Sequence, residues 1–182
     1  NVFNFLYNLF MSRTLSVADY GVLASVLALI TFPSLAAMAI IPLVVHFAGS
    51  YFAKGQLAMV RGFYLLIARF IAIFALVIFL LFLAGLPYIK DFFHINNTFI
   101  LLIINATIFV IFINVINIAF LQAKLAFAYQ VFVNIVAAVL KLILGVIFVF
   151  MGFSVSGAVA AVFLSILVGY VVSFPPLRFV FD

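Results

Sequence analysis

Residues 131–150 read VFVNIVAAVLKLILGVIFVF, an apolar run interrupted by one amide and by one charge, Lys141. A helix needs about 20 mainly apolar residues to cross a bilayer, and this run has that length. A charge at the centre of a bilayer costs about 2.5–3.5 kcal/mol on insertion scales, so it normally faces a cavity or a partner and not lipid. The run therefore predicts a membrane-spanning helix whose Lys141 points into the protein.

Polar neighbours of Lys141 recur on one side of the same helix. Gln130, Asn134, Lys141 and Gly145 are separated by four, seven and four residues, which puts them on one narrow stripe. A membrane helix with one polar, cationic stripe indicates a water-filled path that handles an anionic molecule. A second interpretation stays open, in which Lys141 hydrogen-bonds backbone carbonyls at a kink.

The composition extends this interpretation to the whole chain. Of its 182 residues, 71% are hydrophobic and 6% are charged, and the mean hydropathy is +1.59. Soluble domains carry about 25% charged residues, so the chain is not one of them. The alternation of polar and apolar residues that transmembrane strands require is absent from the sequence. We therefore predict an all-α, polytopic transmembrane helical bundle that lies in a lipid bilayer.

About six helices are expected in a single bundle over residues 1–182, and the first is interpreted as the second half of a truncated helix. The expected spans are 1–12, 17–46, 63–84, 98–121, 129–150 and 157–173. Ser16 and Asp19 form a capping-box pattern that starts the second span. Pro33 and Pro42 predict kinks within it. Polar connections are expected at 46–62, 88–97, 122–126 and 151–156.

Two other spans carry a polar face that serves either packing or a cavity. In the first span this face consists of Asn1, Asn4, Asn8 and Ser12. In the fourth span it consists of Thr107, Asn114 and Asn117. Polar groups in membrane helices turn toward the bundle in either case. Arg69, about two turns into the third span, either contributes to a site or extends its charge to the membrane surface.

The sixth span has a small residue at every fourth position. The ladder consists of Gly157, Ala161, Ser165, Gly169 and Ser173. Small residues at this spacing let helix backbones approach closely, so we expect a packing face here.

The charged and metal-binding residue types exclude several functions. Eight basic residues face three acidic ones, but the basic residues are scattered singly, so nucleic-acid binding is not predicted. There is no Cys, and His46 and His94 are far apart, so no metal site is predicted. No acid–base pair, activated nucleophile or cofactor motif is visible, and we expect neither an enzyme nor a bound cofactor.

The basic residues also predict an orientation. One set of flanks holds Lys54, Arg61, Lys124 and Arg178, whereas the other holds Arg13 and Lys90. Because basic residues concentrate on the cytoplasmic side, this distribution predicts a cytoplasmic N-terminus.

Four short motifs resemble a known family. Residues 12–21, SRTLSVADYG, resemble the R-x-L-x-x-x-D-Y/F-G junction between the first two helices of bacterial polysaccharide flippases. Phe47-Ala48 with Ala53-Lys54-Gly55 is similar to the basic loop after their second helix. Leu121-Gln122 with Phe127, followed by Asn134, Lys141-Leu142 and Gly145, resembles their fourth-to-fifth helix region, and Gly152 with Gly157-Ala158 resembles the start of their sixth helix. Together the motifs cover nearly the whole chain in the family's order and spacing.

The resemblance implies a fold and an activity. These flippases belong to the multidrug/oligosaccharidyl-lipid/polysaccharide exporter superfamily, whose members have two similar bundles around a central cavity. The chain would supply most of the first bundle of a MATE-like transporter, and the C-terminal helical bundle of the same protein would be its partner. Such proteins move a polyprenyl-pyrophosphate-linked oligosaccharide from the inner to the outer leaflet of the bacterial cytoplasmic membrane, for O-antigen, capsule or exopolysaccharide synthesis.

The predicted substrate contacts follow from the charge of a pyrophosphate. Lys141 is the main candidate for the anion, with Asn134 and Gln130 beside it. Arg13, which matches a recurrent family position, and Arg69 are weaker candidates, and Arg13 would otherwise anchor a helix end to lipid phosphate. Amides of the first and fourth spans, including Asn114 and Asn117, are candidates for sugar hydroxyls.

Two rival functions stay open. A MATE-type multidrug exporter generally uses carboxylates inside the membrane, but the only acidic residues, Asp19, Asp91 and Asp182, fall in loops or at the chain end. A non-transporting scaffold subunit of a glycan-synthesis complex would account for the small-residue ladder but not for the polar stripes.

Overall fold

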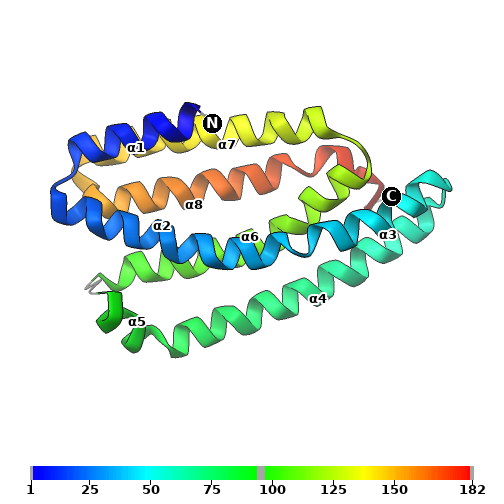
Figure 1. Ribbon diagram of the computed structural model, residues 1–182, viewed down its shortest axis with the longest axis horizontal. Coiled ribbons are helices and arrows are strands. Elements are labelled where there is room, and N and C mark those ends of the chain that lie inside the picture. The colour runs from blue at the N-terminus through cyan, green and yellow to red at the C-terminus, as the bar shows by residue number, and fades with distance from the viewer. Residues whose placement is uncertain (1, 94–96, 181–182) are drawn as a thin grey trace.

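In the computed structural model, residues 2–93 and 97–180 are described and are almost entirely helical (Figure 1). The elements are α1 (Val2–Thr14), α2 (Val17–Met38), α3 (Ile41–Ala53), α4 (Leu57–Ala84), α5 (Leu86–Phe93), α6 (Thr98–Ala123), α7 (Phe127–Phe148), η1 (Val149–Phe153), α8 (Ser154–Val172) and η2 (Pro175–Val180). No strand occurs among these described residues. The prediction of an all-α helical bundle is confirmed.

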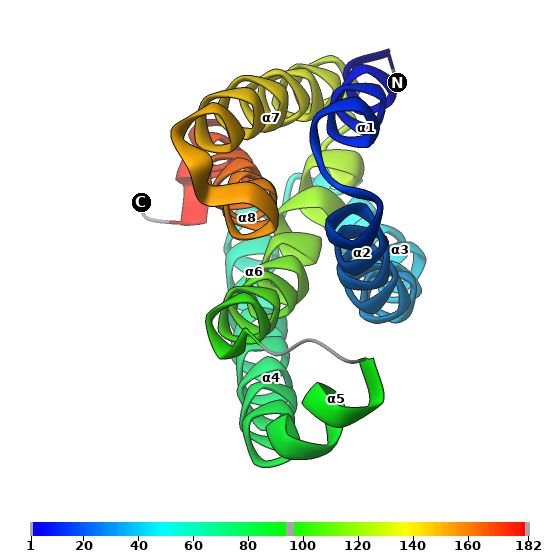
Figure 2. The same ribbon diagram turned by 90° about the vertical axis from the view of Figure 1, so that its left-hand side faces the viewer.

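Four segments are long and apolar enough to cross a membrane. They are Val17–Ala53, Leu57–Ala84, Thr98–Ala123 and Phe127–Val172. The last segment is 46 residues long, and it reverses direction at Gly152, where φ is +88°. As a result α7 and α8 lie side by side as two antiparallel helices (Figures 1 and 2). The chain therefore has the helical character of a membrane protein.

The boundaries of the second and third spans differ from those predicted. Instead of one helix over 17–46, α2 ends at Met38 and α3 begins at Ile41, directly before Pro42. Proline fits the first turn of a helix, where its missing N–H has no partner to lose, so Pro42 is accommodated in the first turn of α3. Pro33 lies inside α2 without ending it. The predicted connection at 46–62 is mostly helical, because α3 continues to Ala53 and α4 already starts at Leu57.

A helix also occupies most of the predicted loop at 88–97. The Gly85-Leu86-Pro87 sequence ends α4 at Ala84 as expected, but Pro87 is the second residue of the short helix α5. The same tolerance of proline in a first turn explains both corrections. His94 and Asn96 in this region, like Asn1 and Asp182 at the ends, lie outside the described residues.

The predicted start of the second span is confirmed at the level of a single hydrogen bond. Ser16 has an extended backbone, and its Oγ accepts a hydrogen bond from the backbone N–H of Asp19 at 3.1 Å. This bond satisfies one of the helix's first N–H groups, which otherwise have no partner. Asp19 in the first turn is also stabilised by the positive end of the helix dipole.

The central helix of the bundle is α6. Half of its most apolar window (50%) is buried inside the protein, compared with at most 17% for the other three segments. It packs against α2, α3, α4 and α8, whereas α1 lies mainly along α7 (Figure 2). The helices α1, α7 and α8 therefore form one group beside α6, and α2, α3 and α4 cover its other sides.

The small-residue ladder of α8 is a packing face, as predicted. Its five members, Gly157, Ala161, Ser165, Gly169 and Ser173, are all buried. A Cβ atom on Gly157 would lie 2.7 Å from Phe148 Cβ, and one on Gly169 would lie 3.4 Å from Ala137 Cβ. The missing side chains thus let α8 approach α7 and the η1 turn closely.

Six of the eight basic residues divide between the two ends of the bundle. Figure 1 shows the α3–α4 turn, the α6–α7 turn and the C-terminal end of α8 at one end, with the α1–α2 junction and α5 at the other. The first end carries Lys54, Arg61, Lys124 and Arg178, and the second carries Arg13 and Lys90. This grouping is the one on which the predicted orientation depends.

We expect Gly157→Ala to destabilise the α7–α8 pair. The added Cβ would meet Phe148 and Phe153 at 2.7 and 2.9 Å, and overpacking of this kind typically costs about 1–3 kcal/mol. Gly62→Ala in α4 is the matched control, because a Cβ there meets nothing within 4 Å. Thermal melts of both purified variants test this, and equal or higher melting temperatures for Gly157→Ala would contradict the tight contact.

Candidate functional site

Lys141 lies on α7 about two turns before η1 and is partly buried. Its Nζ donates a hydrogen bond to Oδ1 of Asn4 on α1 and lies 4.7 Å from the centroid of the Tyr7 ring. Asn4 and Tyr7 are three residues apart, so they share one face of α1. An amide oxygen and an aromatic face both stabilise a cation without neutralising its charge.

Tyr7 holds α1 against both α7 and α8. Its side chain is fully buried, and its hydroxyl donates a hydrogen bond to the backbone oxygen of Ala158 on α8 at 3.0 Å. The ring lies against Gly145, where a Cβ atom would come within 2.7 Å of Tyr7 Cε2. Gly145, predicted as part of the polar stripe, therefore makes room for the ring that contacts Lys141.

An open cavity of about 280 Å³ lies beside Lys141, between α1, α7 and α8. Its lining residues are Asn4, Asn134, Ala137, Ala138, Lys141, Val162, Ser165 and Ile166. One ammonium, two amides and one hydroxyl thus contribute to a cavity among membrane-type helices, and no carboxylate is among the residues that line it. Such a site can attract an anion and hydrogen-bond neutral oxygen groups.

Three other predicted contacts, Gln130, Arg13 and Arg69, do not line this cavity. Gln130 is partly buried on α7 but does not line it. Arg13 is exposed in the last turn of α1. Arg69 is exposed on α4, whose buried face carries Tyr64 and Ile71 instead. Periodicity places a residue on a face of its own helix but does not say which helix that face meets.

Asn117 belongs to a buried hydrogen-bond network on another side of α8. It accepts a hydrogen bond from the Tyr64 hydroxyl at 2.7 Å, and its Nδ2 donates to Ser173 Oγ at 2.7 Å. Ser173 Oγ in turn donates to the backbone oxygen of Tyr170 at 2.6 Å. The network joins α4, α6 and the end of α8, and every polar group in it is paired. The amide oxygen and nitrogen of Asn117 therefore both have protein partners, and Asn117 does not line the cavity beside Lys141.

Two amide oxygens on α6 are buried without a hydrogen-bond partner among the described residues. They are Oδ1 of Asn114 and Oδ1 of Asn105. Asn105 is anchored through its Nδ2, which donates to the backbone oxygen of Phe79 at 3.1 Å. Neither residue lines the cavity beside Lys141. Asn114 is therefore not brought together with Lys141.

Sequence reasoning named only part of the cavity. Asn4 belongs to the polar face of the first span, whose amides are candidates for sugar hydroxyls, whereas Ser165 was expected only in the packing ladder. The signal for Asn4 was present in that polar face. Tyr7 carried no signal, because one aromatic residue in an apolar helix is unremarkable in a chain with 26 Phe and 7 Tyr.

The described residues contain no group of three or more His, Cys, Asp or Glu side chains that could hold a metal ion. The chemistry of the cavity is that of a cation with neutral hydrogen-bonding partners. It suits reversible binding of an anionic group.

Comparison of the chain with protein-family models, curated proteins and solved structures finds no match. The fold and the cavity define a class, an all-α bundle of membrane-type helices with a cationic polar cavity. A narrower assignment depends on the motif resemblance and is a proposal.

We expect Asn117→Ala to lower stability without acting on the cavity. The change leaves the Tyr64 hydroxyl and Ser173 without their buried partner, which lowers the free energy of unfolding by about 1–3 kcal/mol. Thermal melts of Asn117→Ala, Tyr64→Phe and the double variant form a cycle whose coupling energy should exceed about 0.5 kcal/mol. Strict additivity of the two single changes would show that the hydrogen bond between Tyr64 and Asn117 does not contribute to stability.

Proposed function

We propose that the chain is part of a transporter that moves a polyprenyl-pyrophosphate-linked oligosaccharide across the bacterial cytoplasmic membrane, with its N-terminus on the cytoplasmic side. The observation that carries this proposal is Lys141 in a polar cavity among membrane-type helices. A pyrophosphate between leaflets loses its hydration, and a cation at that depth offsets part of the loss.

The partners of Lys141 support a binding role over a purely structural one. Asn4 and Tyr7 are neutral, so an incoming anion finds a positive charge that no carboxylate in the cavity has cancelled. Asn134 and Ser165 line the same cavity. The Asn134 amide can donate to phosphate or sugar oxygens, whereas the Ser165 hydroxyl donates to the backbone oxygen of Val162 at 2.7 Å and can only accept from a sugar hydroxyl. The structural interpretation predicted backbone carbonyls as partners of Lys141, but a side-chain amide is the one observed.

The volume of the cavity supports a two-bundle architecture. Drug-sized ligands occupy sites of about 300–1,000 Å³, so 280 Å³ holds only a fraction of an oligosaccharide. An open cavity of this size serves best as one wall of a larger site, completed by a second bundle. Rocking of the two bundles around the fixed Lys141 would then give alternating access.

The sign of the buried charge favours this proposal over a cation exporter. Asp19 lies in the first turn of α2 and Asp91 in the short helix α5, so neither lies deep in a long span. An exporter of cationic drugs would present an acidic residue to its substrate. The described part of the chain presents Lys141.

The proposal predicts the outcome of a complementation experiment in the parent organism. Deletion of the gene should reduce surface polysaccharide and leave lipid-linked oligosaccharide accumulated in the membrane. The intact gene should return polysaccharide and lipid-linked oligosaccharide to their normal levels. The Lys141→Gln gene should not, because the substitution removes the only charged side chain among the residues that line the cavity. Arg69→Gln is the matched control, since it removes a charge from an exposed site on α4, and it should restore both levels.

Two results would contradict the proposal. Unchanged levels of surface polysaccharide and lipid-linked oligosaccharide after deletion would contradict the flippase function and favour a drug exporter. Full rescue by Lys141→Gln, at equal protein levels, would assign Lys141 a structural role and leave the cavity without its proposed ligand.

A further inference from the structure

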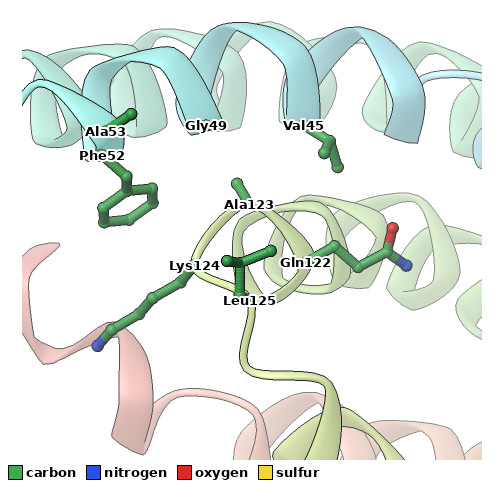
Figure 3. A pocket seen from close by; sticks show the side chains of 8 residues that line it. All are labelled: Val45, Gly49, Phe52, Ala53, Gln122, Ala123, Lys124 and Leu125. Atoms are coloured by element: carbon green, nitrogen blue, oxygen red, sulfur yellow. The ribbon is translucent and has the colours of Figure 1, made fainter.

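The two ends of the bundle place aromatic side chains differently. At the end with the α3–α4 and α6–α7 turns, Val45 and Phe52 line a cavity of about 400 Å³ between α3 and the α6–α7 turn, so they face another part of the chain (Figure 3). At the opposite end, the short helix α5 carries Tyr88 and Phe92, which are 80% and 77% exposed. The transport proposal uses neither feature.

The exposed aromatic residues lie on one side of α5. Tyr88 and Phe92 are four residues apart, so they share a face of the helix, called here the outer face of α5. The other side of the helix carries Leu86, Ile89 and Phe93, which pack against the hydrophobic core of the bundle. The helix is therefore apolar on two sides, and the bundle covers one of them.

Tyr88 is unusual among the tyrosines of this chain. All seven lie within the described ranges, and Tyr88 is the only one whose side chain is exposed. Charged residues accompany it on the same helix, because Asp91 is exposed and Lys90 is half-buried. Aromatic rings next to a phenol hydroxyl and charged groups are typical of the boundary between lipid and water, where one end of a side chain is apolar and the other is wet.

The position of α5 along the bundle agrees with such a boundary. The 28 residues of α4 make a helix about 42 Å long, which exceeds the hydrocarbon thickness of a bilayer, about 30 Å. From Phe70 to Ala84, every exposed side chain of α4 is apolar. The next helix, α5, has eight residues and a length of about 12 Å, so it is too short to cross a membrane. Figure 2 views the bundle from this end and shows α5 running sideways from the end of α4.

We infer that the outer face of α5 inserts into the surface of the lipid bilayer, with Tyr88 and Phe92 at the level where acyl chains meet headgroups. Helices that lie in this plane bury their apolar face about 5–10 Å deep. The exposed apolar surface of α4 continues directly into the outer face of α5, so lipid that covers the end of α4 also reaches α5. The inference depends on the chain lying in a membrane and is independent of what the protein transports.

The test is the depth of a single tryptophan in phosphatidylcholine vesicles. The chain contains no Trp, so Tyr88→Trp provides the only indole, and Phe70→Trp is the matched control because Phe70 is 73% exposed midway along α4. The vesicles contain lipids brominated either close to the headgroup or near the end of the acyl chain. We expect shallow bromines to quench Tyr88→Trp about twofold more strongly than deep bromines, because interfacial rings lie at headgroup level. The order should be reversed for Phe70→Trp.

Acrylamide in the water phase distinguishes the results that would overturn the inference. Quenching of Tyr88→Trp by acrylamide alone would place the outer face of α5 in water. Protection from acrylamide and from both bromines would place it against protein, and stronger quenching by deep bromines would place it inside the hydrocarbon. If Tyr88→Trp does not fold, Phe92→Trp on the same face should show the same order of quenching. The vesicles contain no lipid-linked oligosaccharide, so failure of this test would leave the transport proposal untouched.

Discussion

The charge of Lys141 inside a bundle of apolar helices is the constraint on which the rest of this account depends. A cation at such a depth costs about 2.5–3.5 kcal/mol unless its surroundings compensate. The chain compensates with an amide oxygen from Asn4, the face of the Tyr7 ring and an open polar cavity. These contacts determine how α1 lies on α7, because Tyr7 must fit against Gly145 and bond to Ala158. Local packing and the electrostatics of the cavity therefore share the same residues.

Two kinds of polar cluster coexist among the same helices, and they differ in how completely they are paired. Around Asn117, every side-chain donor and acceptor finds a protein partner, which fixes α4, α6 and α8 relative to one another. Around Lys141, the partners are neutral and the cluster opens to a cavity. A fully paired cluster in an apolar medium is rigid, and one that retains charge and access can exchange partners with a ligand. This contrast separates the structural amides from the candidate binding groups.

Much of the fold follows from the sequence, because long apolar runs and the Ser16 cap are local signals. The boundary near His46 was wrong for a physical reason: polar residues at a membrane surface look like a loop, but α3 continues through them to Ala53. Two members of the predicted polar stripe, Asn134 and Lys141, line one cavity, whereas Gln130 and Gly145 do not. Arg69 and Asn117 show the limit of a prediction from one helix alone. Each has a side chain that could bind an anion or a sugar hydroxyl. The neighbouring helix decides the environment of that side chain, and helical periodicity contains no information on neighbours.

The most direct test is the aqueous accessibility of the cavity and its charge. The chain has no Cys, so Asn134→Cys provides a single thiol in it, and Phe70→Cys, at a 73% exposed apolar site on α4, provides the control. In membranes, a small anionic thiol reagent should modify Asn134→Cys but not Phe70→Cys, and adding Lys141→Gln should slow the anionic reagent more than a neutral one of equal size. No reaction at Asn134→Cys, or equal slowing of both reagents, would contradict a water-accessible cavity that attracts anions through Lys141.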